Sequence, residues 1–144
     1  HLSECGLFDG DEERSVIVTD VHDELERCQR FYSKTFEVDV GPVQNIGSVT
    51  GCARYTASIA TTGNQRSPSW NHPVRMRATQ ITSTLYNPSA ANAQVRDTAG
   101  GSGDCSGSTV QSLNDRSWAV AATGNALTTI GNALAVHATF EAEL

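Results

Sequence analysis

The sequence predicts a mainly β protein, an antiparallel and jelly-roll-like β-sandwich preceded by one helix. Three observations lead to this fold class. Short runs of β-branched and aromatic residues recur along the 144-residue chain and are separated by turns rich in Gly, Asn and Pro. Only one segment, near the start, has the spacing of an amphipathic helix. No regular alternation of strands and helices follows it, so a parallel sheet is not expected.

Length and composition limit the class of protein. A chain of 144 residues forms one domain with a hydrophobic core rather than two. Charged residues make up 18% of the sequence, which is below the roughly 25% of an average soluble domain. No apolar run reaches the roughly 20 residues of a membrane-spanning helix, and no signal peptide is recognised. We therefore expect no membrane insertion, no coiled coil and no disordered chain.

The formal net charge of −6 is concentrated at the start of the chain. Residues 1–27 hold nine acidic residues and two arginines, whereas the remaining 117 residues hold seven acidic and eight basic residues. Because the body is nearly neutral and has no basic stripe, nucleic acid is not an expected partner. We interpret residues 1–19 as an acidic attachment segment that can dock on a basic partner surface. Residues 20–144 are expected to form the folded domain.

The helix is predicted from Asp20 to Ser33. Its apolar positions follow the spacing i, i+4, i+7 and i+11: Val21, Leu25, Cys28 and Tyr32. Asp20 or the preceding Thr19 can cap the helix, and acidic residues occupy its first turn, where the helix dipole favours them. We expect this apolar stripe to pack against the sheet, with Cys28 reduced and buried.

The other elements are predicted to be strands and polar loops. Strands are expected at residues 15–19, 35–40, 48–62, 74–86, 93–97, 117–123 and 133–144. Segments 63–73 and 98–108 are rich in Gly, Ser and Asn, and they lack the apolar anchors of a core. Both are therefore expected to be exposed loops. His137 lies in the middle of the last strand, where we expect it to face solvent or a neighbouring subunit.

The cysteines and histidines do not have the spacing of a metal site. Cys5, Cys28, Cys52 and Cys105 contain no C-x-x-C pair, and the histidines are isolated from one another. Four cysteines permit two disulfides in three pairings, and free thiols are an equal alternative for a protein made in a cytosol. We expect neither a metal nor a cofactor.

Three segments occur in a characteristic order: DELERCQRFYSKTF (23–36), PVRMRATQITSTLYNP (73–88) and the ending SWAVAATGNAL…ALAVHATFEAEL (117–144). Together they resemble the C-terminal β-sandwich module of bacteriophage tail fibre and receptor-binding proteins. That family has a CQRYY-type helix, then PVxMRA and TLYxP strands, and a last strand that ends in AEL. The resemblance covers roughly residues 23–144. The chain has Gln80 where the family usually has Pro, and residues 1–22 lack the sugar-binding-like sandwich that usually precedes the module.

The resemblance implies a virion component, made in the bacterial cytoplasm and placed at the host-facing end of a tail or head fibre. It also implies a homotrimer in which residues 20–144 are the fibre-tip domain. From its acidic charge, we expect the segment 1–19 to contact other virion proteins. It assigns no catalytic residue. The residues agree with this, because the chain has no G-x-S-x-G elbow and no Lys follows the GGSG run at 100–103. We therefore expect no enzyme activity.

Four residues of the segment 63–73 are the candidate ligand-binding residues: Arg66, Trp70, Asn71 and His72. Within seven residues they supply a guanidinium, an aromatic face, an amide and an imidazole, the groups that stack on sugar rings and hydrogen-bond to hydroxyls. The alternative for Trp70 is a lid on the core, and Trp118 is expected in the core. The leading hypothesis is recognition of a host-surface glycan or protein. The other is a purely structural virion part, such as a trimeric head fibre, a decoration protein or an adaptor.

Overall fold

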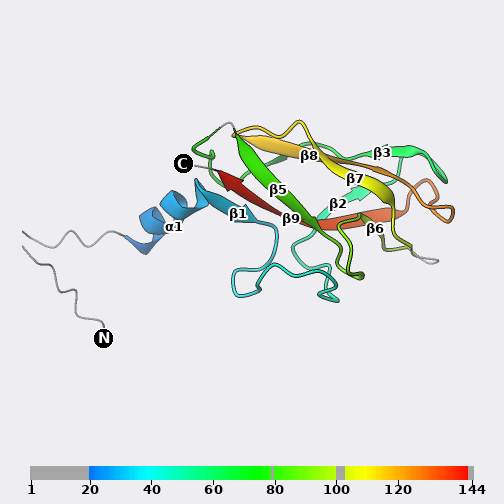
Figure 1. The fold of residues 1–144 in the computed structure, drawn as a ribbon, viewed down its shortest axis with the longest axis horizontal. Helices are drawn as coiled ribbons and strands as arrows, with labels where there is room; N and C mark the ends of the chain where they lie inside the picture. Colours follow the sequence, from blue (N-terminus) through cyan, green and yellow to red (C-terminus); the bar gives the residue numbers. More distant parts are fainter. Residues whose placement is uncertain (1–19, 79, 100–102, 143–144) are drawn as a thin grey trace, which may run out of the picture.

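The computed structural model describes residues 20–78, 80–99 and 103–142. These residues form two antiparallel sheets and a single short helix, the arrangement expected of a β-sandwich (Figure 1). In chain order the elements are α1 (Val21–Gln29), β1 (Tyr32–Lys34), β2 (Ala53–Thr56), β3 (Asn64–Arg66), β4 (Trp70–Asn71), β5 (Ile81–Tyr86), β6 (Arg96–Asp97), β7 (Ser106–Gln111), β8 (Ser117–Thr123) and β9 (Ala133–Ala142). Within these residues, no helix has the length and apolar character needed to cross a bilayer.

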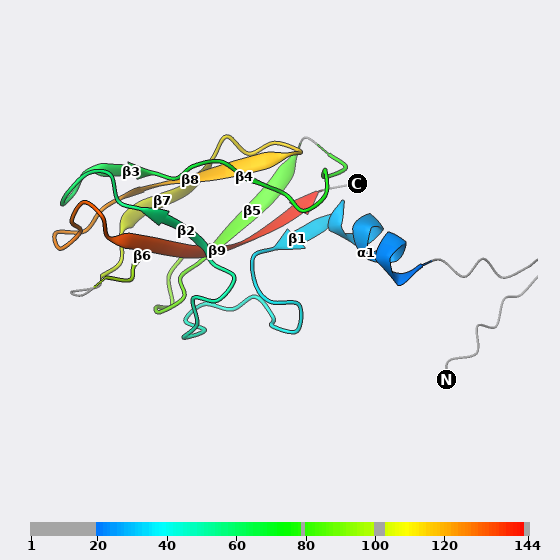
Figure 2. The same ribbon diagram turned by 180° about the vertical axis from the view of Figure 1, so that it is seen from behind.

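Each sheet is built around one long central strand. In the first sheet, β9 pairs with β1 and β2 and also with β5 and β6. In the second sheet, β8 pairs with β3, β4 and β7. Figures 1 and 2 show the second sheet stacked over the first. The two central strands were both predicted, at 117–123 and 133–144, and residues 143–144 lie outside the described residues.

The core fills the space between the sheets. Alternate residues of β8 are buried, as expected for a strand with one face on the core. From Leu134 to Phe140 every residue of β9 is buried, so both faces of this strand are covered. Buried side chains of the two sheets meet in one cluster: Tyr55, Leu85, Leu134, Val136 and Phe140 from the first sheet, and Trp118, Val120 and Ala122 from the second.

The outer face of β9 is covered by the segment that follows β1. Residues 35–40 were predicted to form a strand, but they form no strand, and Phe36 is buried there. The Phe36 ring stacks on His137 at a centroid distance of 4.0 Å. His137 Nδ1 lies 3.2 Å from Thr35 Oγ1, and Nε2 lies 3.3 Å from the Ser48 carbonyl oxygen. The expectation that His137 faces solvent or a neighbouring subunit is therefore wrong, because this segment covers it.

Several predicted strands are shorter in the structure. Of the strand predicted at 48–62 only β2 forms, and of that predicted at 74–86 only β5 forms. Gly51 lies just before β2, where only glycine fits: its φ is +77°, and a Cβ there would collide with the Thr35 carbonyl oxygen. The strand predicted at 15–19 and the attachment segment 1–19 lie outside the described residues.

The Gly/Ser segment 98–108 was expected to be an exposed loop, and this is wrong for its C-terminal part, residues 105–108. Cys105 is buried and β7 begins at Ser106. The Asp104 carboxylate holds the neighbouring turn, since it accepts hydrogen bonds from Asn87, Asn92 and Arg96 at 2.8 to 2.9 Å. Burial alone acts to raise the pKa of Asp104, but these three donors hold it below the ordinary value.

The helix is shorter than predicted and lies away from the core. Asp20 caps it, because its Oδ1 accepts from the His22 amide at 3.1 Å. It ends at Gln29 rather than at Ser33, because residues 32–34 pair with β9 instead. None of its residues is buried, and Figure 1 shows α1 extending beyond the end of the sandwich. The prediction that Cys28 is buried is therefore wrong.

Candidate functional site

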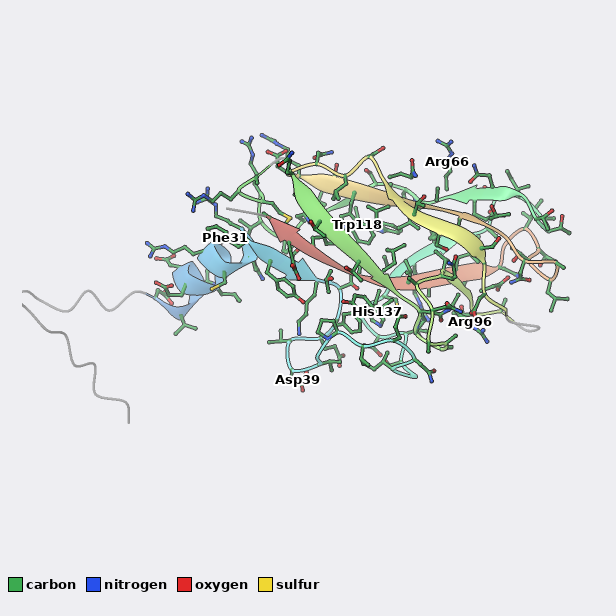
Figure 3. The ribbon with its side chains drawn as sticks, viewed as in Figure 1. Phe31, Asp39, Arg66, Arg96, Trp118 and His137 are labelled. Carbon is green, nitrogen blue, oxygen red and sulfur yellow. The ribbon has the colours of Figure 1, made fainter. Side chains whose placement is uncertain are left out.

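A hollow of about 270 Å³ opens between the edges of the two sheets. One side is formed by β1 and β2 of the first sheet, and the other by β4 of the second. We call it the aromatic hollow, because its lining includes Trp70, His72, Trp118 and Phe140. Figure 3 shows Trp118 between the two layers of the sandwich. Concave sites of this kind, with apolar walls and a few polar groups, are where proteins most often bind small ligands.

Trp70 is both a core residue and a wall of the aromatic hollow. It pairs with Trp118 across β4 and β8, and their ring centroids are 4.8 Å apart. Its ring also lies 6.0 Å from that of Tyr55. The side chain is half-buried rather than carried on an exposed loop, so the alternative of a lid on the core is confirmed. The expected location of Trp118 in the core is also confirmed.

His72 is held at the end of β4 with only 7% of its surface exposed. Its backbone amide donates to the Arg116 carbonyl at 2.8 Å, and its Nδ1 lies 3.3 Å from Ser33 Oγ. Nε2 has no hydrogen-bond partner among the described residues. Burial lowers the pKa of His72, although the Asn114 carbonyl and the Asp115 carboxylate oppose part of this effect. Burial thus favours the neutral form of the ring.

The contact between Ser33 and His72 differs from that of a catalytic pair. In a Ser–His–Asp triad the nucleophilic hydroxyl contacts Nε2 and the carboxylate contacts Nδ1. Here the hydroxyl contacts Nδ1, and both side chains are buried. This contact fixes the plane of the imidazole ring, which also lies edge-on to Phe140 at a centroid distance of 4.9 Å.

The structure brings three of the four candidate residues together. Trp70, Asn71 and His72 all line the aromatic hollow, and Asn71 is exposed at its rim. Arg66 is exposed on β3 and lines neither this hollow nor the one beside it. Figure 3 shows Arg66 at the outer side of the second sheet, away from Trp118. The predicted loop is in fact an edge that pairs with β8 through β3 and β4, which corrects its assignment as an exposed loop.

A second hollow, of about 360 Å³, lies on the other side of His72 along the same edge. We call it the arginine hollow, because its lining is Asn71, His72, Arg75 and Arg116. Arg75 forms an ion pair with Asp115 through Nε. Arg116 lies far from His72 in the sequence, and only the pairing of β4 with β8 brings them together. No local sequence signal marks Arg75 and Arg116 as functional residues.

Metal and thiol chemistry have no support in the described residues. No group of three or more His, Cys, Asp or Glu side chains among them is placed to hold a metal ion. Cys28, Cys52 and Cys105 are free thiols. Burial raises the pKa of Cys52 to about 12 and that of Cys105 to about 11, so both remain protonated at pH 7.

Comparison of the chain with protein-family models, curated proteins and solved structures returned no match. Function is therefore inferred from the fold, the site and the residue patterns of the chain.

Proposed function

We propose that this protein is a non-enzymatic module of a bacteriophage fibre that recognises a glycan or a protein on the host surface. The observation that carries the proposal is the aromatic hollow, where Trp70, Asn71 and His72 present an aromatic ring, an amide and an imidazole together. The three segments that resemble phage fibre modules support the virion location.

The construction of the site suits recognition. Trp70 is fixed by its contacts with Trp118 and Tyr55, and His72 is fixed by Ser33 and Phe140. Such groups lose little conformational freedom when a ligand binds, so more of the contact energy remains as affinity. Asn71 is exposed at the rim, where its amide can donate to and accept from hydroxyl groups.

The apolar stripe of α1 supports assembly into a homotrimer. Val21 is 83% exposed and Leu25 is 48% exposed, and Cys28 lies exposed between them and the strand β1. Val21, Leu25 and Cys28 follow the spacing of one helix face, so they form a single exposed apolar stripe on α1. A second and third copy of the chain, each bringing the same stripe, would cover these side chains.

The same stripe favours the second candidate function, a purely structural virion component. A head fibre, decoration protein or adaptor needs only surfaces that hold its neighbours, and α1 with the acidic segment 1–19 would supply them. In that case the aromatic hollow would bind nothing. The two functions therefore differ in whether the isolated protein binds host cells.

The test measures binding of the purified, labelled full chain to a panel of bacterial strains, with Asn71→Ala as the site variant. Asn71 is exposed, so its removal is expected to leave the fold unchanged. The variant should bind more weakly by about 1 kcal/mol, the net value of one hydrogen bond. Asn64→Ala is the matched control, since Asn64 is also exposed and lies on β3, away from the hollow.

Saturable binding to a strain, weakened by Asn71→Ala and unchanged by Asn64→Ala, would support recognition. Absence of binding to every strain, with the protein folded and assembled, would contradict recognition and favour the structural candidate. Trp70→Ala is unsuitable for this test, because Trp70 also packs on the core, and its loss would lower stability as well as binding.

A further inference from the structure

The two hollows share Asn71 and His72, but the other side chains that line them differ: aromatic rings line the first, and two arginines line the second. We propose that together they form one binding surface for an acidic saccharide, with a sugar ring in the aromatic hollow and its carboxylate or phosphate group at Arg75 and Arg116. The inference rests on the proposed function of host-surface recognition, and it specifies the chemical class of the ligand.

The strand pairing fixes the arrangement. Asn71 pairs with Ser117, and the His72 amide donates to the Arg116 carbonyl. Just beyond β4, the Met76 amide donates to the Asp115 carbonyl at 2.8 Å. Arg75 and Arg116 are therefore held on two adjacent backbone segments that flank the end of β4. Positioning on paired segments, rather than on a free loop, keeps both guanidinium groups at one wall.

The charges of the arginine hollow are unbalanced. Arg75 is paired with Asp115, whose side chain is only 18% exposed. Arg116 is exposed, and no carboxylate in the described part of the chain is within ion-pair distance of it. Two guanidinium groups thus face one carboxylate. An anionic ligand supplies the second negative charge, and the planar fork of Arg116 can bind a carboxylate or phosphate through two parallel hydrogen bonds.

His72 forms the wall that the two hollows share. Its Nδ1 lies 3.3 Å from Ser33 Oγ, and the Asn114 carbonyl also acts on the ring. His72 is therefore a fixed part of the wall, and the anion is bound by Arg75 and Arg116.

The test uses the full-length protein on an array of neutral, carboxylated and phosphorylated bacterial saccharides. Each carboxylated saccharide that binds is compared with its carboxyl-reduced form, which keeps the ring and loses the charge. Arg116→Gln should weaken binding of the acidic saccharide by about ten- to hundredfold, the usual effect of losing a charged hydrogen-bond donor. Arg27→Gln is the control, because Arg27 is exposed on α1 and lines neither hollow.

The results separate this inference from the function on which it rests. Binding that is lost on carboxyl reduction and weakened by Arg116→Gln supports it, as does binding confined to phosphorylated saccharides with the same dependence on Arg116. Binding of neutral saccharides, or binding unchanged by Arg116→Gln, overturns the inference and leaves host recognition standing. Cell binding without any saccharide binding also overturns it and indicates a protein receptor. Failure to bind both saccharides and cells overturns both proposals.

Discussion

The strand β9 and the helix α1 both carry apolar side chains, but the surroundings of these side chains differ completely. β9 pairs with four strands, and every residue from Leu134 to Phe140 is buried. α1 contacts the sandwich mainly through β1, and none of its residues is buried. β9 runs along the sandwich, and its C-terminal end lies toward α1 (Figure 2), where the Ala142 amide donates to the Phe31 carbonyl at 2.8 Å.

This difference shows that an apolar pattern predicts a need for burial but not the partner that satisfies it. The apolar residues of β9 are covered by its own chain, on one face by the second sheet and on the other by the segment after β1. Within the described residues, the stripe of α1 has no comparable cover. Its exposed valine and leucine therefore form a surface suited to another copy of the chain.

The largest expected effect comes from shortening one leucine in each element. Leu134→Ala in β9 should lower the free energy of unfolding by about 3 kcal/mol, because Leu134 is fully buried and its loss leaves a cavity. Leu25→Ala in α1 should change it by about 0.5 kcal/mol or less, since Leu25 is half-exposed. Urea unfolding at low protein concentration measures both. Equal losses would show that α1 packs on a core, contrary to the structure.

The two central strands were predictable, whereas the elements around α1 were not. Trp118, Val120 and Ala122 stand at alternate positions of β8, the period of a strand with one buried face. The residues of β9 form a mainly apolar run that follows the turn residues Gly131 and Asn132.

At residues 30–40 the local sequence pattern favours a helix, whereas pairing with a distant strand favours an extended backbone. The helical spacing reaches Tyr32, but an open edge of β9 pairs with residues 32–34, and Phe36 is needed to cover His137. These preferences depend on distant residues, so the local pattern could not reveal them.

The candidate site was predictable only in part, for the same reason. Trp70, Asn71 and His72 are adjacent in the sequence, and their chemistry could be recognised there. Whether Trp70 was a loop or a core residue depended on Trp118, its partner across β4 and β8. The arginine hollow depends on the same pairing, because Arg116 reaches His72 only through it.

Acid is expected to have an intermediate effect on the stability of the protein. Burial lowers the pKa of His137 and of His72 below the ordinary value of 6.5. The unfolded chain therefore binds protons more readily than the folded one, so stability is complete above about pH 6.5 and falls as the pH drops below it. Melting temperature measured against pH gives the profile. The lowered pKa of Asp104 causes a separate loss at lower pH, below its ordinary value of 3.8.

A pair of histidine variants connects this acid effect with the two elements. His137→Gln removes a buried imidazole from β9 and should flatten the profile just below pH 6.5. His22→Gln removes an exposed imidazole from α1, with 75% of the side chain accessible, and serves as the control. A profile that stays steep in the His137 variant would assign the acid sensitivity to His72 or to another group.

The smallest expected effect on stability is also the most direct test of what covers α1. If the helix packed on the sheet, Cys28→Asp would bury a charge and would strongly lower the free energy of unfolding. Since Cys28 is exposed, the variant should lose only about 0.3 to 1 kcal/mol of stability, the cost of an acid near a helix C-terminus.

The charge of Cys28→Asp should nevertheless prevent self-association, because it lies in the apolar stripe. Light scattering at micromolar concentration is expected to find trimers of the parent and of Cys28→Ser but monomers of Cys28→Asp. If the parent protein stays monomeric, the trimer is refuted and the stripe binds a different partner. If the melting temperature of Cys28→Asp falls sharply, α1 folds back onto the sandwich.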